Sequence, residues 1–125
     1  MSALLASSTH AAWPWPDSLD ALVAAPAYHD LLLENERVRV IYTHIPSGAT
    51  VPVHTHRWSS VAYLLSWSDF IRRDHHGNVL LDSRQSRAAP PQIPTVQWLQ
   101  PLPPHTVENV GPSEIRIFIV ELKDM

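Results

Sequence analysis

The sequence predicts an all-β protein, a sandwich or barrel built from short strands. Apolar and polar residues alternate over most of the chain after residue 28, and turn-forming residues recur about every 8–12 positions. Almost no segment has the period of a helix. The 125 residues suffice for one domain with a buried core, and a composition of 45% hydrophobic and 17% charged residues is typical of globular proteins.

Charge and cysteine content exclude several classes of function. The net charge is −3 and the nine Lys and Arg residues are scattered, whereas nucleic-acid binding requires a clustered basic face. With no cysteine, disulfides, thiolate metal sites and a cysteine nucleophile are excluded, which leaves the eight histidines as candidate metal ligands. We find no apolar run of about 20 residues and no positively charged signal-peptide start, so we expect a cytoplasmic protein without membrane contact.

We expect an N-terminal arm and a short helix over residues 1–28, followed by a β-barrel domain over residues 29–125. The alternate prolines of Trp13-Pro14-Trp15-Pro16 exclude helix and central strand. Two interpretations of this arm stay open, packing on its own domain and packing on a partner subunit. Asp17 and Ser18 offer N-cap chemistry for a helix over residues 19–25, which Pro26 ends.

The barrel is predicted from a series of short strands and turns. Residues 37–45 form the clearest strand, with Tyr42 and His44 on one face and Arg39, Ile41 and Thr43 on the other. Residues 74–78 are a strong hairpin signal. The other predicted strands are residues 31–33, 51–56, 61–65, 70–73, 79–81, 96–99, 106–110 and 115–122.

Two histidines one residue apart dominate the chemistry of the chain. His54 and His56 lie in a predicted strand, where residues i and i+2 project from the same face about 6–7 Å apart. Two imidazoles at this spacing fit one metal ion with metal–nitrogen bonds of about 2 Å. A third ligand must come from elsewhere in the fold.

Two spacings resemble known family motifs. Gly48, five residues and then His54-Thr55-His56 match the opening of the first cupin motif, and His105 with Asn109 matches the end of the second. The chain therefore resembles the cupin superfamily, and more closely the small single-domain bacterial cupins. That closer likeness covers about residues 29–123 and includes these segments: Glu34-Asn35-Glu36-Arg37-Val38-Arg39-Val40, Glu108-Asn109-Val110-Gly111 and Val120-Glu121-Leu122-Lys123.

The resemblance implies an RmlC-like jelly roll, also called a double-stranded β-helix, and a homodimer. It also implies a metal site of His54, His56 and His105. The glutamate that cupins commonly add to such a site is absent, since Ser60 and Val61 hold its positions. Three-histidine cupins point to non-haem Fe(II) dioxygenases, so Fe²⁺ is favoured over Zn²⁺, Mn²⁺ or Ni²⁺ as the divalent ion. The alternative for the histidines is a metal-free pocket.

Strand parity predicts which side chains surround the site. If Ser60 faces inward, Ala62 does too, and these small residues leave a roomy cavity. Val107 shares a face with His105, and we expect Asn109 to hydrogen-bond the backbone. Tyr42, Trp58 and Trp98 complete the candidate substrate pocket, with a packed position, a dimer contact and burial in the barrel as their respective alternatives.

The remaining polar candidates are weaker. Arg39 and Arg57 have the fork geometry to bind a substrate carboxylate, although rim arginines are more common. His75 and His76 belong to the hairpin turn and should be exposed, and His10 and His29 show no pattern. The leading hypothesis is a metal-dependent enzyme acting on a small molecule. A non-catalytic ligand-binding cupin and a Zn-type lyase or isomerase are the alternatives.

Overall fold

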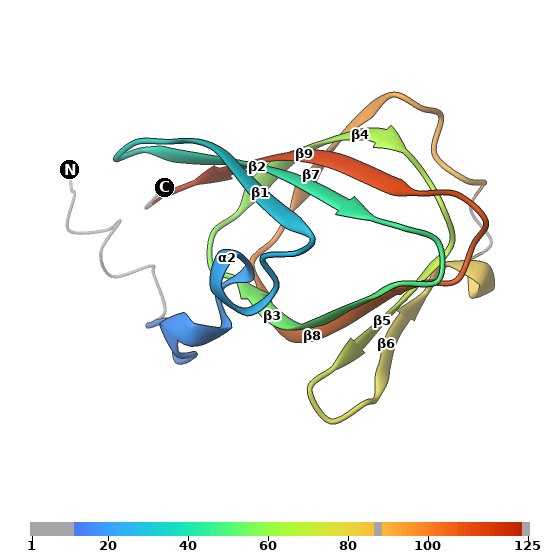
Figure 1. Ribbon diagram of the computed structural model, residues 1–125, viewed down its shortest axis with the longest axis horizontal. Coiled ribbons are helices and arrows are strands. Elements are labelled where there is room, and N and C mark those ends of the chain that lie inside the picture. Colours follow the sequence, from blue (N-terminus) through green and yellow to red (C-terminus); the bar gives the residue numbers. More distant parts are fainter. Residues whose placement is uncertain (1–11, 87–88, 124–125) are drawn as a thin grey trace, which may run out of the picture.

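The computed structural model describes residues 12–86 and 89–123, which form two antiparallel sheets facing each other (Figure 1). His10 and most of the predicted arm lie outside the described residues. Within these described residues there are three short helices: η1 (Asp17–Leu19), α2 (Ala21–Ala24) and η2 (Ser83–Gln85). The strands are β1 (His29–Glu34), β2 (Val38–Ile45), β3 (Thr50–His56), β4 (Ser60–Ser66), β5 (Phe70–Asp74), β6 (Val79–Asp82), β7 (Thr95–Leu99), β8 (Leu102–Asn109) and β9 (Ile115–Leu122).

The two sheets have the strand orders expected of a jelly roll. The larger sheet runs β1-β2-β9-β4-β7 and the smaller one β3-β8-β5-β6, so that strands distant in sequence become neighbours. Every pairing within the two sheets is antiparallel. The predicted all-β jelly-roll class is therefore confirmed.

Burial in β2 follows the period of two, with one unexpected member. Arg39, Ile41, Thr43 and Ile45 are buried and face the interior, while the residues between them are half-buried. Alternation predicts the two faces but not which one turns inward when a face carries arginine. Here the face with Arg39 turns inward, because its guanidinium is paired with the buried carboxylate of Glu121 and with Asp20, as described below.

The helix before the barrel is shorter than predicted. The sequence indicates residues 19–25 with a cap at Asp17 or Ser18, but α2 spans only Ala21–Ala24. Asp20 is the N-cap, and its carboxylate accepts a hydrogen bond from the Leu22 amide at 3.1 Å. Asp17 instead begins η1. The cap moves because Asp20 is also held by Arg39, an interaction that no local pattern reveals.

The apolar core is sparse for a β-sandwich. One buried cluster consists of Ala25, Ile45, Val51 and Ile115. A second consists of Ala62, Leu64 and Ile119. Many inward side chains instead surround a cavity of about 380 Å³. All members of these clusters except Ala25 also line the cavity, so the apolar core forms its wall.

The junction after β8 is the tightest point between the sheets. The Asn109 side-chain amide donates to the carbonyls of Ile45 (2.9 Å) and Ser113 (2.8 Å), as the backbone role expected for it requires. The Gly111 amide returns a bond to the Asn109 side-chain oxygen at 3.1 Å. A Cβ at Gly111 would lie 2.8 Å from the Asp69 backbone nitrogen, so only glycine fits.

Gly111→Ala is expected to destabilise the fold by about 1–3 kcal/mol, because the added methyl group overlaps backbone that the β5–β8 pairing holds in place. Urea unfolding measures the change. Ser113→Ala is the matched control, since Ser113 contributes only backbone groups to this junction, and it should be nearly neutral. Equal stability of the two variants would contradict the proposed crowding.

Candidate functional site

The cavity between the two sheets receives side chains from most strands of the barrel. Ser60, Ala62 and Leu64 of β4 all line it, which is the inward parity expected of this strand. The wall is mainly aliphatic, from Ile45, Val51, Leu99, Leu102, Val107, Ile115, Ile117 and Ile119. Such a wall keeps water away from whatever the polar residues hold.

Strand β3 brings both motif histidines into this cavity. Its register against β8 shifts between Val51 and His54 and again between His54 and His56. Residues three apart face opposite sides of a regular strand, but the irregularity lets Val51 and His54 both line the cavity. His54 pairs directly with His105 of β8, and their ring centroids lie 4.3 Å apart.

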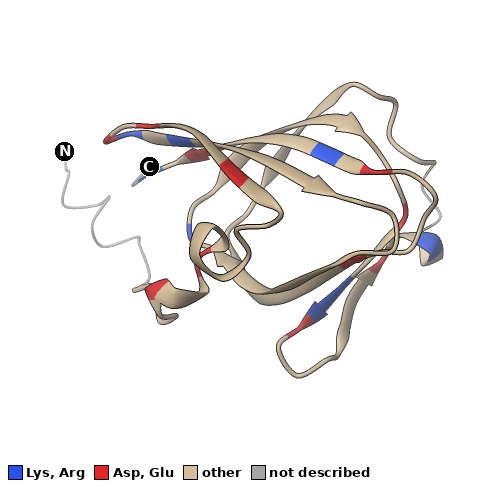
Figure 2. Cartoon of the chain, in the orientation of Figure 1, with Lys and Arg blue, Asp and Glu red and all other residues tan. Residues whose placement is uncertain are grey.

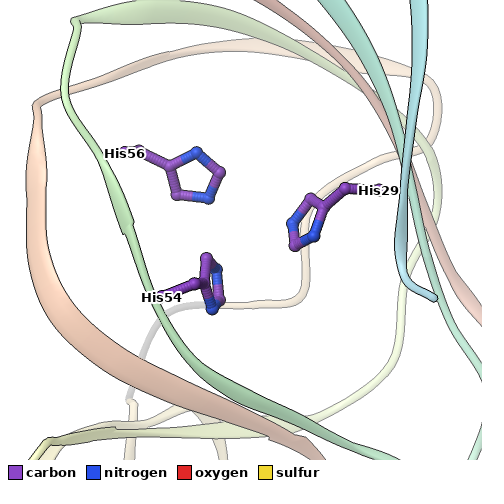
Figure 3. Close-up of side chains that lie close together, drawn as sticks. All are labelled: His29, His54 and His56. Carbon is purple, nitrogen blue, oxygen red and sulfur yellow. The ribbon is translucent and has the colours of Figure 1, made fainter. Parts of the chain in front are cut away.

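A fourth histidine, His29, joins this group from the start of β1. Its ring lies 5.0 Å from that of His54 and 5.6 Å from that of His56. His29, His54 and His56 each offer a ring nitrogen, and these three atoms lie within 4.8 Å of one another. Figure 3 shows the three rings pointing toward a common point from β1 and β3. No local pattern indicates His29, because His54 and His56 lie on the other sheet.

All four histidines use one nitrogen to bind the protein. The Nδ1 of His54 donates to the Pro52 carbonyl and that of His105 to the Pro103 carbonyl, each at 2.8 Å. His29 Nδ1 donates to the Ala25 carbonyl, at the end of α2, at 2.9 Å. A carbonyl only accepts, so Nδ1 carries the proton and Nε2 presents its lone pair. The repeated Pro-x-His pattern is a signal that sequence reasoning overlooked.

A buried carboxylate holds the fourth ring. His56 Nδ1 donates to Glu121 Oε2 at 3.0 Å, and the side chain of Glu121 is fully buried. Arg39 donates to Glu121 Oε1 at 2.8 Å and binds Asp20 through both terminal nitrogens. With Arg39 on one carboxylate oxygen and His56 on the other, Glu121 has a hydrogen-bond partner at both oxygens and fixes the orientation of the His56 ring. Glu121 shares the inward face of β9 with Ile115, Ile117 and Ile119, a parity that marks it in the sequence.

Burial keeps the imidazoles of His29, His54 and His105 neutral. Desolvation, with a contribution from His56, lowers the pKa of His54 to about 2, that of His105 to about 3 and that of His29 to about 4. A neutral imidazole with a free lone pair is the form that binds a metal ion. The outer hydrogen bonds to Nδ1 are of the kind that orients metal-binding histidines in proteins. The residues present therefore fit a divalent ion.

The structure places the predicted ligands together but groups them differently. His54, His56 and His105 all line the one cavity, as does His29. The tightest set of ring nitrogens contains His29 in place of His105. His105 is 5.8 Å from His56, centroid to centroid, and borders the group on the side of β8. Ser60, in the position of the missing glutamate, lines the cavity without a carboxylate.

Three of the six predicted pocket residues lie elsewhere. Ser60, Ala62 and Val107 line the cavity, but Tyr42, Trp58 and Trp98 do not. Tyr42 is on the outer face of β2, where its hydroxyl accepts from Arg116 Nε at 3.1 Å. Trp98 is 53% exposed because its neighbours on β7, Gln97 and Leu99, take the inward positions. Arg39, a candidate for binding the carboxylate of a substrate, is instead paired with Glu121 and Asp20 of the protein itself.

Trp58 lies on the loop after β3 and contacts the outside of the site. It packs beneath Arg39, whose guanidinium carbon is 5.1 Å from the ring centroid. With Trp13 and Pro16 it lines a second hollow of about 330 Å³. The part of the arm that the structure describes therefore packs on its own domain here. His75 and His76 are exposed in the β5–β6 turn, as expected.

Comparison with solved structures identifies the architecture. The structure is similar to a cupin domain from Bordetella pertussis Tohama I, with a TM-score of 0.59 and 19% identity over 76% of this chain and 91% of that one. It is also similar to an RmlC-like cupin family protein with a double-stranded β-helix fold from Methanocaldococcus jannaschii, with a TM-score of 0.52 and 11% identity over 75% and 77% of the two chains. The chain has the cupin fold.

Sequence comparison adds nothing to this likeness. No family model matches the chain, and no curated protein matches it. At these identities the solved cupins define the fold alone, so the chemistry of this cupin barrel depends on its own residues. Among the described residues, no helix is long and apolar enough to cross a membrane.

The buried histidines predict a stability that depends on pH. Since folding lowers the pKa of His29, His54 and His105, the unfolded chain binds protons first as the pH falls below about 6.5. For chelator-treated protein we expect the free energy of unfolding to be largest above that pH and to fall between about pH 6.5 and 4. Each histidine contributes up to about 1.4 kcal/mol per pH unit.

Urea unfolding at a series of pH values measures this slope. His29→Gln should reduce the slope by the share of one histidine, because glutamine does not titrate. A free energy of unfolding that stays constant from pH 7 to 5 would contradict the burial of neutral imidazoles.

Proposed function

We propose that this protein is a metal-dependent enzyme acting on a small organic molecule, and specifically a non-haem Fe(II) dioxygenase. The observation that carries the proposal is the shared anchoring of the four histidines, whose Nδ1 atoms all hydrogen-bond to carbonyls or to Glu121. Their Nε2 atoms are left as ligands. His54 and His56 would hold the ion, together with His29, His105 or both.

The donor set suits redox or Lewis-acid chemistry. Bound Fe(II) supplies reactivity toward dioxygen, whereas Zn(II) in the same place would support lyase, isomerase or hydrolytic chemistry. Neutral imidazoles leave the charge of the ion uncompensated, which favours a negatively charged substrate. The aliphatic wall excludes water, and Glu121 fixes the orientation of His56.

A non-catalytic ligand-binding cupin is the second candidate. Among the described residues, no Asp or Glu lines the cavity, so a carboxylate for general acid–base catalysis is missing from the wall. If the ion is absent in solution, the same cavity is a binding site for an organic molecule. Metal content separates the two functions.

Replacing a ligand by glutamine should remove the metal while keeping the volume of the side chain. We expect near-stoichiometric iron, measured by emission spectroscopy, in protein purified without chelator. His54→Gln should lose it, because His54 is central to both groupings of three histidines. His29→Gln and His105→Gln tell which of the two completes the site. His75→Gln is the matched control and should keep its metal.

Oxygen uptake on addition of candidate substrates distinguishes the chemistry. Iron with oxygen consumption supports the dioxygenase, and zinc without it supports lyase or isomerase chemistry. A protein that holds no metal and gains no thermal stability from Fe²⁺, Zn²⁺, Mn²⁺ or Ni²⁺ would contradict the metal-dependent function and favour the binding module.

We also propose a homodimer formed through the outer face of the larger sheet. Tyr42, Phe118, Tyr63 and Val96 are successive partners across β2, β9, β4 and β7. Phe118, Tyr63 and Val96 are 36%, 39% and 60% exposed. A continuous apolar row of this kind is typical of a surface that packs against another protein, and a second copy offers the same row.

The double substitution Tyr63→Glu/Phe118→Glu should convert the dimer to a monomer, because it places charges in the centre of the apolar row. Size-exclusion chromatography with light scattering reports the mass. Leu80→Glu is the control, since Leu80 is 55% exposed but lies on β6 of the other sheet. A wild-type monomer at micromolar concentration, or a dimer in the double variant, would contradict this interface.

A further inference from the structure

Arg72 of β5 lines the cavity without an acidic partner. Val107, its register partner on β8, lines the cavity too, so Arg72 projects from the inner face of the smaller sheet. Most other arginines in the described part of the chain are engaged. Arg39 binds Glu121 and Asp20, Arg73 binds Glu108, and Arg84 binds Asp82. No hydrogen bond or ion pair within the described residues holds the side chain of Arg72.

The Nε of Arg72 is buried and has no hydrogen-bond partner. Three side-chain atoms are in this state among the described residues, and two of them, Arg72 Nε and Thr43 Oγ1, belong to residues of this one cavity. Thr43 lies on the opposite sheet. Leaving a buried donor unpaired costs free energy, and an unpaired buried charge costs more. Two such groups in one cavity indicate a polar ligand that satisfies them.

The charged residues that line the cavity indicate the charge of that ligand. Figure 2 shows long uncharged stretches of strand between the charged positions. Among the described side chains that line the cavity, Arg72 is the only Arg, Lys, Asp or Glu. Desolvation lowers the pKa of its guanidinium, and the positive charge of Arg72 contributes to the lowered pKa of His105. A cation that lines the cavity with no carboxylate among the described lining residues favours an anionic ligand.

We propose that Arg72 binds the carboxylate of a small organic acid whose apolar part fills the aliphatic cavity. The planar fork of the guanidinium matches a carboxylate through two parallel hydrogen bonds. Phe70, 5.7 Å from the guanidinium carbon of Arg72, supports the side chain from one face. The volume of about 380 Å³ admits a single ring or a short chain and excludes a polymer.

This inference rests on the proposed function, because it treats the cavity as the place where substrate binds. It adds a substrate class, a small carboxylic acid with an apolar body, and a residue that selects it. The carboxylate would enter with its charge toward β5, while the histidines of β1, β3 and β8 face the remaining space. Arg72 is thus a specificity residue, separate from the ligands of the ion.

Binding of acids and of their neutral amides to chelator-treated protein tests the role of Arg72. The probes are benzoate, phenylacetate and hexanoate, each paired with its amide and measured by calorimetry at neutral pH. We expect the acids to bind about tenfold or more tightly than the amides, since charge-assisted hydrogen bonds are the strong ones. Arg72→Gln should lose that preference, while Arg73→Gln, the paired neighbour, should retain it.

Thermal stability supplies a second measurement, whose expected result differs from that for an arginine with a purely structural role. Without ligand, Arg72→Leu should raise the melting temperature, because it removes an unpaired charge from an apolar cavity. Added benzoate should raise the melting temperature of the wild type and not that of Arg72→Leu. A melting temperature that falls on Arg72→Leu, or acids and amides that bind the wild type equally, would overturn the proposal.

Metal content keeps this proposal distinct from the function on which it rests. Arg72→Gln should bind as much metal as the wild type, because none of the four histidines bonds to Arg72. Loss of metal in His54→Gln with acid preference intact supports both proposals. Wild-type protein that prefers acids but holds no metal would contradict the metal-dependent function and leave the carboxylate site supported. An Arg72→Gln variant that prefers acids as strongly as the wild type would contradict the carboxylate site and leave the metal-dependent function untouched.

Discussion

The buried ion pair between Arg39 and Glu121 is the interaction on which the rest of the site depends. Glu121 is fully buried, so without Arg39 it would be an uncompensated charge, a loss of about 3–5 kcal/mol. Through Asp20 the pair also fixes the start of α2, and the carbonyl of Ala25, which follows this helix, accepts a hydrogen bond from His29 Nδ1. Through its second oxygen Glu121 orients His56. One salt bridge therefore connects the fold of the N-terminal segment with two histidines on different strands.

The orientation of the histidine rings is the second constraint. Backbone carbonyls impose it on His29, His54 and His105, and the carboxylate of Glu121 imposes it on His56. The Pro52 and Pro103 carbonyls each lie two residues before a histidine and accept a hydrogen bond from its Nδ1. These bonds place the proton of the neutral ring on Nδ1, and burial lowers the pKa so that the neutral form, with a free Nε2, persists at neutral pH. The Nε2 atoms of His54 and His105 therefore have free lone pairs in the folded protein without a bound ion.

The cavity places opposing demands on the protein. A barrel of this size gains stability by filling its middle with apolar side chains, yet here small residues such as Ser60 and Ala62 leave it open. Buried polar atoms of Thr43 and Arg72 lack partners at its wall. Each omission lowers stability, and a site that binds a ligand is where such costs are commonly retained. The ion pair of Arg39 and the junction at Asn109 offset them elsewhere in the barrel.

The sequence by itself determined the all-β class, most strand positions, the inward parity of Ser60 and Ala62, and the presence of His54, His56 and His105 in one cavity. These features follow from a period of two and from motif spacing. Only the tertiary structure decided that Arg39 turns inward, that Tyr42 and Trp98 turn outward, and that His29 joins the site. The physical reason is the same in each case. A strand has two faces that alternation cannot rank, and contacts across sheets, such as Arg39 with Glu121 or His29 with His54, join residues that share no local pattern.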